Sequence, residues 1–153
     1  MSDYKLIPEL KAWDDHNGGE ITPEEWVNAM GSYSFAIAYA SLIWPEFVEQ
    51  DGMVFRENVT AEQAQQWMTQ FDNDKKAIEA MVNHFHILDI QHPGAWQEVT
   101  ETQVRFLGET LRDAWTAKLA IDCPTKTFIV ELIEGSASDL REYQILFYQS
   151  HEV

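Results

Sequence analysis

The sequence feature that most constrains the fold is an uncharged run from Trp26 to Trp44. Its length is close to the roughly 20 residues that a membrane-spanning helix needs. However, its flanks are acidic (Glu24, Glu25, Glu46 and Glu49), so it lacks the Lys and Arg bias that orients membrane spans. The run also contains polar and small residues that suit packing against other helices, namely Asn28, Gly31, Ser32, Ser34, Ala36, Ala38, Ala40 and Ser41. We therefore expect a long central helix, buried in the protein and ended by Pro45, and no membrane association.

Helix-start signals recur along the first two thirds of the chain. Three threonines precede a Glu or Gln by three residues, which is the capping-box pattern: Thr22 with Glu25, Thr60 with Gln63, and Thr100 with Gln103. Apolar residues follow each signal at helical spacing. A further helix is expected after Asp72 or Asp74, with an apolar stripe of Ile78, Met81, Val82 and Phe85. Asp51-Gly52, between apolar residues, predicts a short hairpin within residues 47–55.

The C-terminal part of the chain changes to a period of two. Apolar residues alternate within residues 128–133 and again within residues 143–148, with a loop around Gly135 to Asp139. This pattern predicts an antiparallel β-hairpin. Both of its faces carry apolar residues, so we expect the protein's own helices to cover them; the alternative is an edge or face left for a partner, including a second copy in a homodimer. The expected fold is α+β: one mostly helical domain over residues 1–153, with a long buried central helix and a C-terminal antiparallel β-hairpin.

The chain is strongly acidic, with 26 Asp and Glu, 10 Lys and Arg, and a formal net charge of −16. Residues 1–74 hold 14 of the acidic residues and 3 of the basic ones. Such a surface repels nucleic acid and anionic membranes, and it attracts basic proteins. The single cysteine, Cys123, excludes an internal disulfide, and residues 1–10 lack a secretory signal pattern, so the cytoplasm is the expected location.

Residues 14–25 resemble the calcium-binding loop of EF-hand proteins. Asp14 matches the first ligand position, Gly19 the sharp turn, Ile21 the apolar position and Glu25 the final bidentate carboxylate. The loop departs from the EF-hand pattern because His16 and Gly18 occupy two positions where oxygen ligands are expected. The resemblance implies a calcium site that uses Asp14 and Glu25; the alternative is that these residues only end one helix and cap the next.

A second candidate for metal binding is the segment from His84 to His92, which contains His84, His86 and His92. Three imidazoles could supply a transition-metal site. If the preceding helix continues through this segment, as Phe85 and Leu88 favour, His84 and His86 diverge around the helix and share no ligand. We therefore expect histidines at a helix end and in a loop, and we expect no bound cofactor.

No nucleophile elbow, P-loop, dinucleotide fingerprint or Cys-x-x-Cys motif is present, so an enzyme is the less favoured class. The favoured hypothesis is a small acidic protein-binding domain that captures a basic partner. Immunity proteins that neutralise nuclease toxins, nucleic-acid mimics and some adaptor proteins share this physical profile. The expected partner-binding residues are acids of the first half: Asp14, Asp15, Glu20, Glu46, Glu49 and Asp51. The alternative function is metal binding through residues 14–25 or 84–92.

Overall fold

The computed structural model describes residues 4–56 and 58–150. Its backbone contacts divide the chain into two compact units, Met1–Ala40 and Ser41–Val153. Helices and antiparallel strands are both present, which confirms the α+β class. Whether the two units unfold together as the single domain expected from the chain length stays a prediction. Among the described residues, no helix combines the length and the apolar character needed to cross a membrane.

The first unit consists of helices α1 (Glu9–Asn17) and α2 (Pro23–Met30) and most of α3 (Tyr33–Ile43). The rings of Trp13 in α1 and Trp26 in α2 meet edge to face, with centroids 5.0 Å apart. The predicted capping box of α2 is confirmed, since Thr22 and Glu25 bond reciprocally. Residues 14–25 thus end one helix and cap the next, which is the alternative given above for this segment.

The prediction of one long buried helix over residues 26–44 is wrong in two respects. The helix stops at Met30, because Gly31 leaves the helical conformation, and α3 starts at Tyr33. A side chain at Gly31 would collide with the carbonyl oxygen of Val27, so the break depends on glycine. Neither α2 nor α3 contains a buried residue. The apolar composition of this segment favours burial. It could not show whether other parts of the described chain would bury it.

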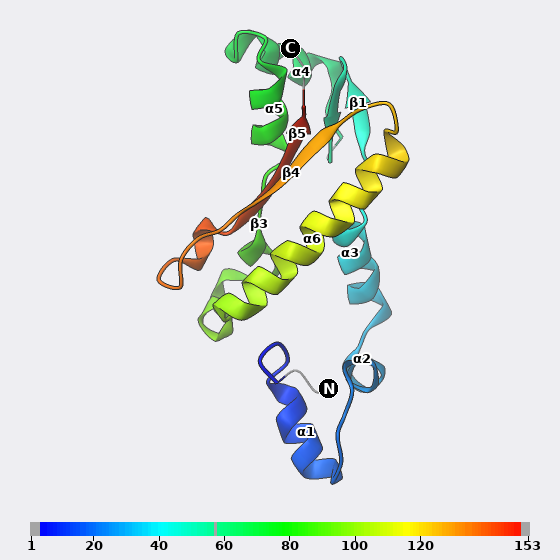
Figure 1. Ribbon diagram of the computed structural model, residues 1–153, viewed down its shortest axis with the longest axis vertical. Helices are drawn as coiled ribbons and strands as arrows, with labels where there is room; N and C mark the ends of the chain where they lie inside the picture. Colours follow the sequence, from blue (N-terminus) through cyan, green and yellow to red (C-terminus); the bar gives the residue numbers. More distant parts are fainter. Residues whose placement is uncertain (1–3, 57, 151–153) are drawn as a thin grey trace. The chain divides into compact units, whose positions relative to one another are not determined.

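After the end of α3, the second unit forms the short antiparallel hairpin of β1 (Val48–Gln50) and β2 (Met53–Phe55), which confirms the prediction for residues 47–55. Asp51 and Gly52 both have positive φ values, as a tight hairpin turn requires. Then follow α4 (Ala61–Gln70), α5 (Lys75–Val82), β3 (Phe85–His86) and two 3₁₀ helices, η1 (Ile87–Ile90) and η2 (Pro93–Glu98). Long α6 (Glu101–Asp122), β4 (Phe128–Ile133), η3 (Leu140–Glu142) and β5 (Gln144–Gln149) complete the chain (Figure 1).

The predicted C-terminal hairpin is confirmed as β4 and β5, which pair from Phe128 with Gln149 to Ile133 with Gln144. Strand β3 pairs with the other side of β5, so the sheet order is β3-β5-β4. Helix α6 runs along one face of this sheet (Figure 1). The approach is close at Gly108, where a side chain would collide with Leu132 of β4.

The expectation that helices cover both faces of the hairpin is only half right. Helix α6 covers the face that carries Val130, Leu132 and Phe147, and these residues join the core. On the opposite face, Ile129 and Ile133 of β4 stay exposed. Helix α5 packs against β5, and its packing against β5 is more extensive than any against β4. Strand β4 is thus an edge strand with an incompletely covered outer face.

The core of the second unit has two parts. The larger surrounds the fully buried Trp115 of α6, with Tyr143, Ile145 and Phe147 from the end of the chain. The indole Nε1 of Trp115 donates to the carbonyl oxygen of Leu42, 3.0 Å away, which fixes the end of α3 to α6. The smaller part lies between β2, α4 and α5 and consists of Met53, Phe55, Val59, Ala64 and Ile78.

Candidate functional site

The two carboxylates expected to bind calcium are engaged in holding helix ends. Asp14 accepts hydrogen bonds from the hydroxyl of Tyr4 and from the backbone N–H of Ile21. Glu25 accepts from the backbone N–H of Thr22 at 2.8 Å and from its hydroxyl at 3.0 Å. These bonds from Thr22 lower the pKa of Glu25. Helix α1 also continues to Asn17. The segment is therefore a pair of helices joined by a capped connection, and donors of the protein itself occupy the carboxylates of Asp14 and Glu25.

The histidine segment differs from the expectation because α5 ends at Val82 and the backbone is extended at Phe85 and His86. In an extended strand, residues two apart share a face. The rings of His84 and His86 therefore meet edge to face, with centroids 5.4 Å apart. The prediction that the two rings diverge was wrong because the apolar spacing of Phe85 and Leu88 suggested a helix that continues beyond Val82, where α5 in fact ends.

Each of the three histidines of this segment uses its Nδ1 atom in a hydrogen bond to the backbone. Nδ1 of His84 bonds the carbonyl of Met81, and Nδ1 of His86 bonds the carbonyl of Arg141 at 2.9 Å. Nδ1 of His92 accepts from the backbone N–H of Gly94. Over residues 4–56 and 58–150, no group of three His, Cys, Asp or Glu side chains comes together closely enough to hold a metal ion.

His84 and His86 line a pocket of about 630 Å³ in the second unit. Its polar wall also includes Arg56, Asn58, Gln63 and Asp89, and its apolar wall Val59, Trp67, Met81, Val82 and Phe85. The guanidinium of Arg56 lies over the rings of Phe85 and Trp115, at 5.3 and 5.5 Å from their centroids. The volume is in the usual range for ligand pockets. The lining mixes a cation, an anion, amides and imidazoles, so it selects no single ligand charge.

The six acids expected to bind a partner divide into two kinds. Asp14 is bound to Tyr4 and Ile21, Asp15 pairs with Lys11 at 2.8 Å, and Glu49 pairs with Lys126 at 2.9 Å. The side chains of the other three take part in no recorded contact and are exposed: Glu20, Glu46 and Asp51. Only the second kind is free to meet another molecule without first breaking a bond within the chain.

The acids lie in a part of the chain that has no counter-charge of its own. Between residues 12 and 55 there are eight Asp and Glu residues and no Lys or Arg. The paired acids of this stretch in the structure reach basic residues outside it, as Asp15 reaches Lys11 and Glu49 reaches Lys126. The stretch therefore carries an excess of negative charge, which Lys11 and Lys126 offset only in part.

The same stretch carries an apolar surface that the sequence placed in the core. Six large side chains on α2 and α3 are between 44% and 91% exposed: Val27, Met30, Tyr33, Phe35, Ile37 and Tyr39. We call this set the α2–α3 apolar surface. The rings of Phe35 and Tyr39 stack on each other at 6.3 Å and form an aromatic pair on the helix. Large exposed apolar side chains concentrated on one segment are a feature of protein-binding surfaces.

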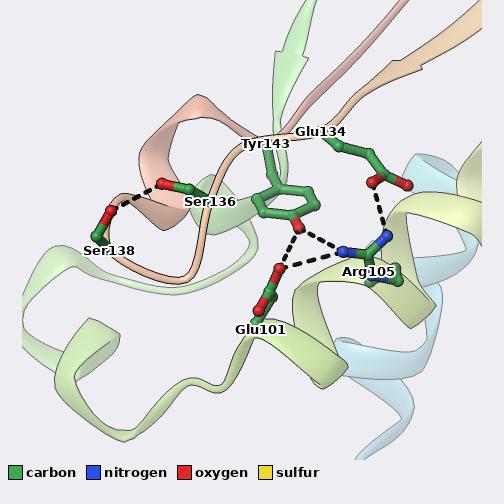
Figure 2. Close-up of polar contacts among 6 residues, drawn as sticks. All are labelled: Glu101, Arg105, Glu134, Ser136, Ser138 and Tyr143. Carbon is green, nitrogen blue, oxygen red and sulfur yellow. Dashed lines mark hydrogen bonds and ion pairs between the residues drawn. The ribbon is translucent and has the colours of Figure 1, made fainter.

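A polar cluster that the sequence did not indicate joins α6 to the loop after β4. The buried Tyr143 donates its hydroxyl proton to Glu101 at 2.7 Å and accepts from Arg105 at 2.9 Å, while Arg105 also donates to Glu101 at 3.1 Å and to Glu134 at 2.6 Å. Figure 2 shows Tyr143, Glu101 and Arg105 as a closed triangle, with Glu134 on the outer side of Arg105.

The cluster shifts the pKa of its members in the directions that hydrogen bonding dictates. The bond from Tyr143, followed by that from Arg105, lowers the pKa of Glu101, and the same bond to Glu101 raises the pKa of Tyr143. Spacing alone suggested only the pair of Glu101 and Arg105, four residues apart on one helix. Tyr143 and Glu134 join it through the fold of the hairpin. Tyr143, Glu101 and Arg105 bond to one another, and Glu134 bonds to Arg105, so the arrangement holds the loop to α6.

Comparison with known proteins found no matching protein family, no similar curated protein and no similar solved structure. The function therefore has to be argued from the chemistry of this chain.

Proposed function

We propose that this protein is a small acidic protein-binding domain that captures a basic partner, in the manner of immunity or inhibitor proteins. The observation that carries the proposal is the stretch from residue 12 to 55, which has eight carboxylates and no Lys or Arg. Glu20, Glu46 and Asp51 are exposed within it and take part in no recorded side-chain contact. A concentrated negative potential accelerates encounter with a positively charged protein and rejects nucleic acid.

Metal binding, the other function expected from the sequence, is not supported by a specific contact. Asp14 and Glu25 already accept hydrogen bonds that fix the connection between α1 and α2. His84 and His86 approach each other, but His92 does not line their pocket. Protein binding needs no rearrangement of this kind, because its charged groups are already exposed.

The experiment that tests the proposal compares three immobilised proteins. The first is the wild type, the second carries Glu20→Gln, Glu46→Gln and Asp51→Asn, and the third carries Glu62→Gln, Glu98→Gln and Glu109→Gln. The third variant loses the same number of charges from exposed positions outside the stretch. Each is exposed to lysate of the native host at low salt, and bound proteins are eluted with a salt gradient and identified by mass spectrometry.

We expect a basic protein to elute from the wild type at moderate salt, because screening weakens exposed charge pairs. It should elute earlier from the second protein and at nearly the wild-type position from the third. Retention that does not change with salt would contradict the proposal. An equal loss of retention on the third protein would reduce the effect to net charge and would exclude a specific role for Glu20, Glu46 and Asp51.

A further inference from the structure

We infer that α3, together with the end of α2, is the docking element of the proposed complex, and that its partner is a basic protein with an apolar contact surface bordered by Lys or Arg. This inference rests on the proposed function. It adds that apolar burial on α3, and not charge pairing, supplies most of the affinity. The carboxylates that flank α2 and α3 in the chain then govern the rate of encounter and the choice of partner.

The first argument is the distribution of apolar side chains around α3. Tyr33 and Ile37 lie one turn apart on one side of the helix, and Phe35 and Tyr39 lie one turn apart on the other. All four are exposed, and Ser34 and Ala36 between them add no charge. A helix that is apolar on all sides is stable in water only when other groups surround it. The partner surface must therefore contact both sides of α3.

The second argument concerns which molecule can provide that cover. A second copy of this chain would bring the same excess of carboxylates to the same place, with no Lys or Arg between residues 12 and 55 to compensate. Helices that lie on membrane surfaces carry Lys and Arg on their polar face, and α2 and α3 have none. A protein with an apolar surface and a basic border complements both the side chains and the charge.

The acids next to the docking element in the chain fit this border. Glu24 lies in the first turn of α2 and Glu46 follows the end of α3, and both are exposed without a recorded partner. Aromatic and aliphatic anchors surrounded by polar groups form the common arrangement of a protein interface. Tyrosine, as at Tyr33 and Tyr39, is one of the residue types enriched among such central anchors, and phenylalanine, as at Phe35, is enriched at interfaces in general.

The test uses the full-length chain and two synthetic probes. One probe is an amphipathic helical peptide of leucine and lysine, and the other is the same peptide with glutamate in place of lysine. Binding is measured by calorimetry for the wild type and for two double variants, Tyr33→Gln with Ile37→Gln, and Phe35→Gln with Tyr39→Gln. Glutamine favours the helix, so it removes the apolar groups without disfavouring α3. Ile121→Gln is the matched control, because Ile121 is equally exposed on α6.

We expect the lysine peptide to bind the wild type and the glutamate peptide not to bind. Each double variant should bind the lysine peptide with an affinity at least about tenfold lower than that of the wild type, as expected for the loss of anchor residues. Ile121→Gln should bind like the wild type. Added salt should lower the affinity for the lysine peptide by the same factor in the wild type and in both double variants, because all three proteins carry the same carboxylates.

The outcomes separate this inference from the proposed function. Wild-type affinity in both double variants, with salt dependence kept, would overturn the docking role of α3 and leave the capture of basic partners in place. Failure of the lysine peptide to bind, or an equal loss with Ile121→Gln, would also overturn it. A dimer in sedimentation equilibrium that both double variants abolish would assign α3 to self-association. Binding of the wild type alone to phosphatidylcholine vesicles would assign it to lipid.

Discussion

At the scale of single residues, Tyr143 joins an acidic and a basic side chain in one hydrogen-bonded cluster. Its hydroxyl bonds Glu101 and Arg105 at the same time, although the tyrosine itself is fully buried. Arg105 completes the cluster by bonding Glu134 after β4. The ionised form of Glu101 is favoured in the folded protein because it accepts two of these bonds. The stability of the protein should therefore depend on whether the carboxyl group of Glu101 is ionised.

We expect the substitution Tyr143→Phe to destabilise the protein at neutral pH by more than at acid pH. The bond from Tyr143 lowers the pKa of Glu101 in the folded state. A carboxyl group with a lowered folded pKa stabilises the protein above its unfolded pKa of about 4.3, and this contribution is lost as the pH falls through the folded value. Urea unfolding of both proteins from neutral pH to below about pH 3 measures the difference.

The matched control is Tyr39→Phe, since Tyr39 is exposed and its hydroxyl has no recorded partner. Its effect on unfolding should be small and independent of pH. If the difference between the wild type and Tyr143→Phe stays constant down to the lowest pH, the carboxylate of Glu101 is not the group that Tyr143 stabilises.

At the scale of elements, α5 joins the two sheets of the second unit through buried polar side chains. The carboxylate of Glu79 accepts from the backbone N–H of Val54 in β2 and from the backbone N–H and side-chain amide of Gln149 in β5, all within 2.6 to 2.7 Å. Asn83, one turn later, accepts from the N–H of Arg56 at 3.0 Å and donates to the carbonyl of Val54 at 2.8 Å. Both side chains are fully buried. They satisfy strand edges that would otherwise lack partners.

We expect Glu79→Gln to lower the free energy of unfolding by about 2 kcal/mol, because one amide nitrogen would face a donor and the bonds from N–H groups to a carboxylate would be lost. Chemical denaturation measures the change. Glu62→Gln on α4 makes the same chemical substitution at an exposed position and should have almost no effect. Equal stability of the two variants would show that the bonds of Glu79 do not hold β2 and β5 to α5.

At the scale of the whole molecule, the net charge of −16 is the dominant property. Several ion pairs are present on the described surface, such as Lys11 with Asp15, but the acids outnumber the bases by more than two to one. Exposed pairs of this kind add little stability individually. The remaining carboxylates repel one another, and this repulsion opposes the compact state.

We therefore expect sodium chloride to raise the midpoint of thermal unfolding between low and physiological ionic strength, because salt screens the repulsion over about 10 Å. Differential scanning calorimetry measures the shift. The variant with Glu20→Gln, Glu46→Gln and Asp51→Asn should be more stable at low salt and should respond less to added salt. A midpoint that falls with salt would mean that attractive pairs outweigh the repulsion.

The sequence determined the features that depend on neighbouring residues. The three capping boxes begin α2, α4 and α6 because a threonine and a Glu or Gln three residues later bond locally. The hairpin of β4 and β5 follows from a period of two, and the turn of β1 and β2 from Asp51-Gly52. The acidic character also follows from composition, whereas only the structure separated Glu20, Glu46 and Asp51 from the paired acids Asp14, Asp15 and Glu49.

Only the tertiary structure decided which surfaces meet. It brought His84 and His86 together by ending α5 early, and it joined Tyr143 and Glu134 to a helix about 30 to 40 residues away in the chain. It also left α3 exposed, although its composition is that of a core helix. Apolar periodicity shows that a side chain favours burial, but burial requires a second surface. Distant residues of the chain or another molecule supply that surface, and the local sequence pattern determines neither of them.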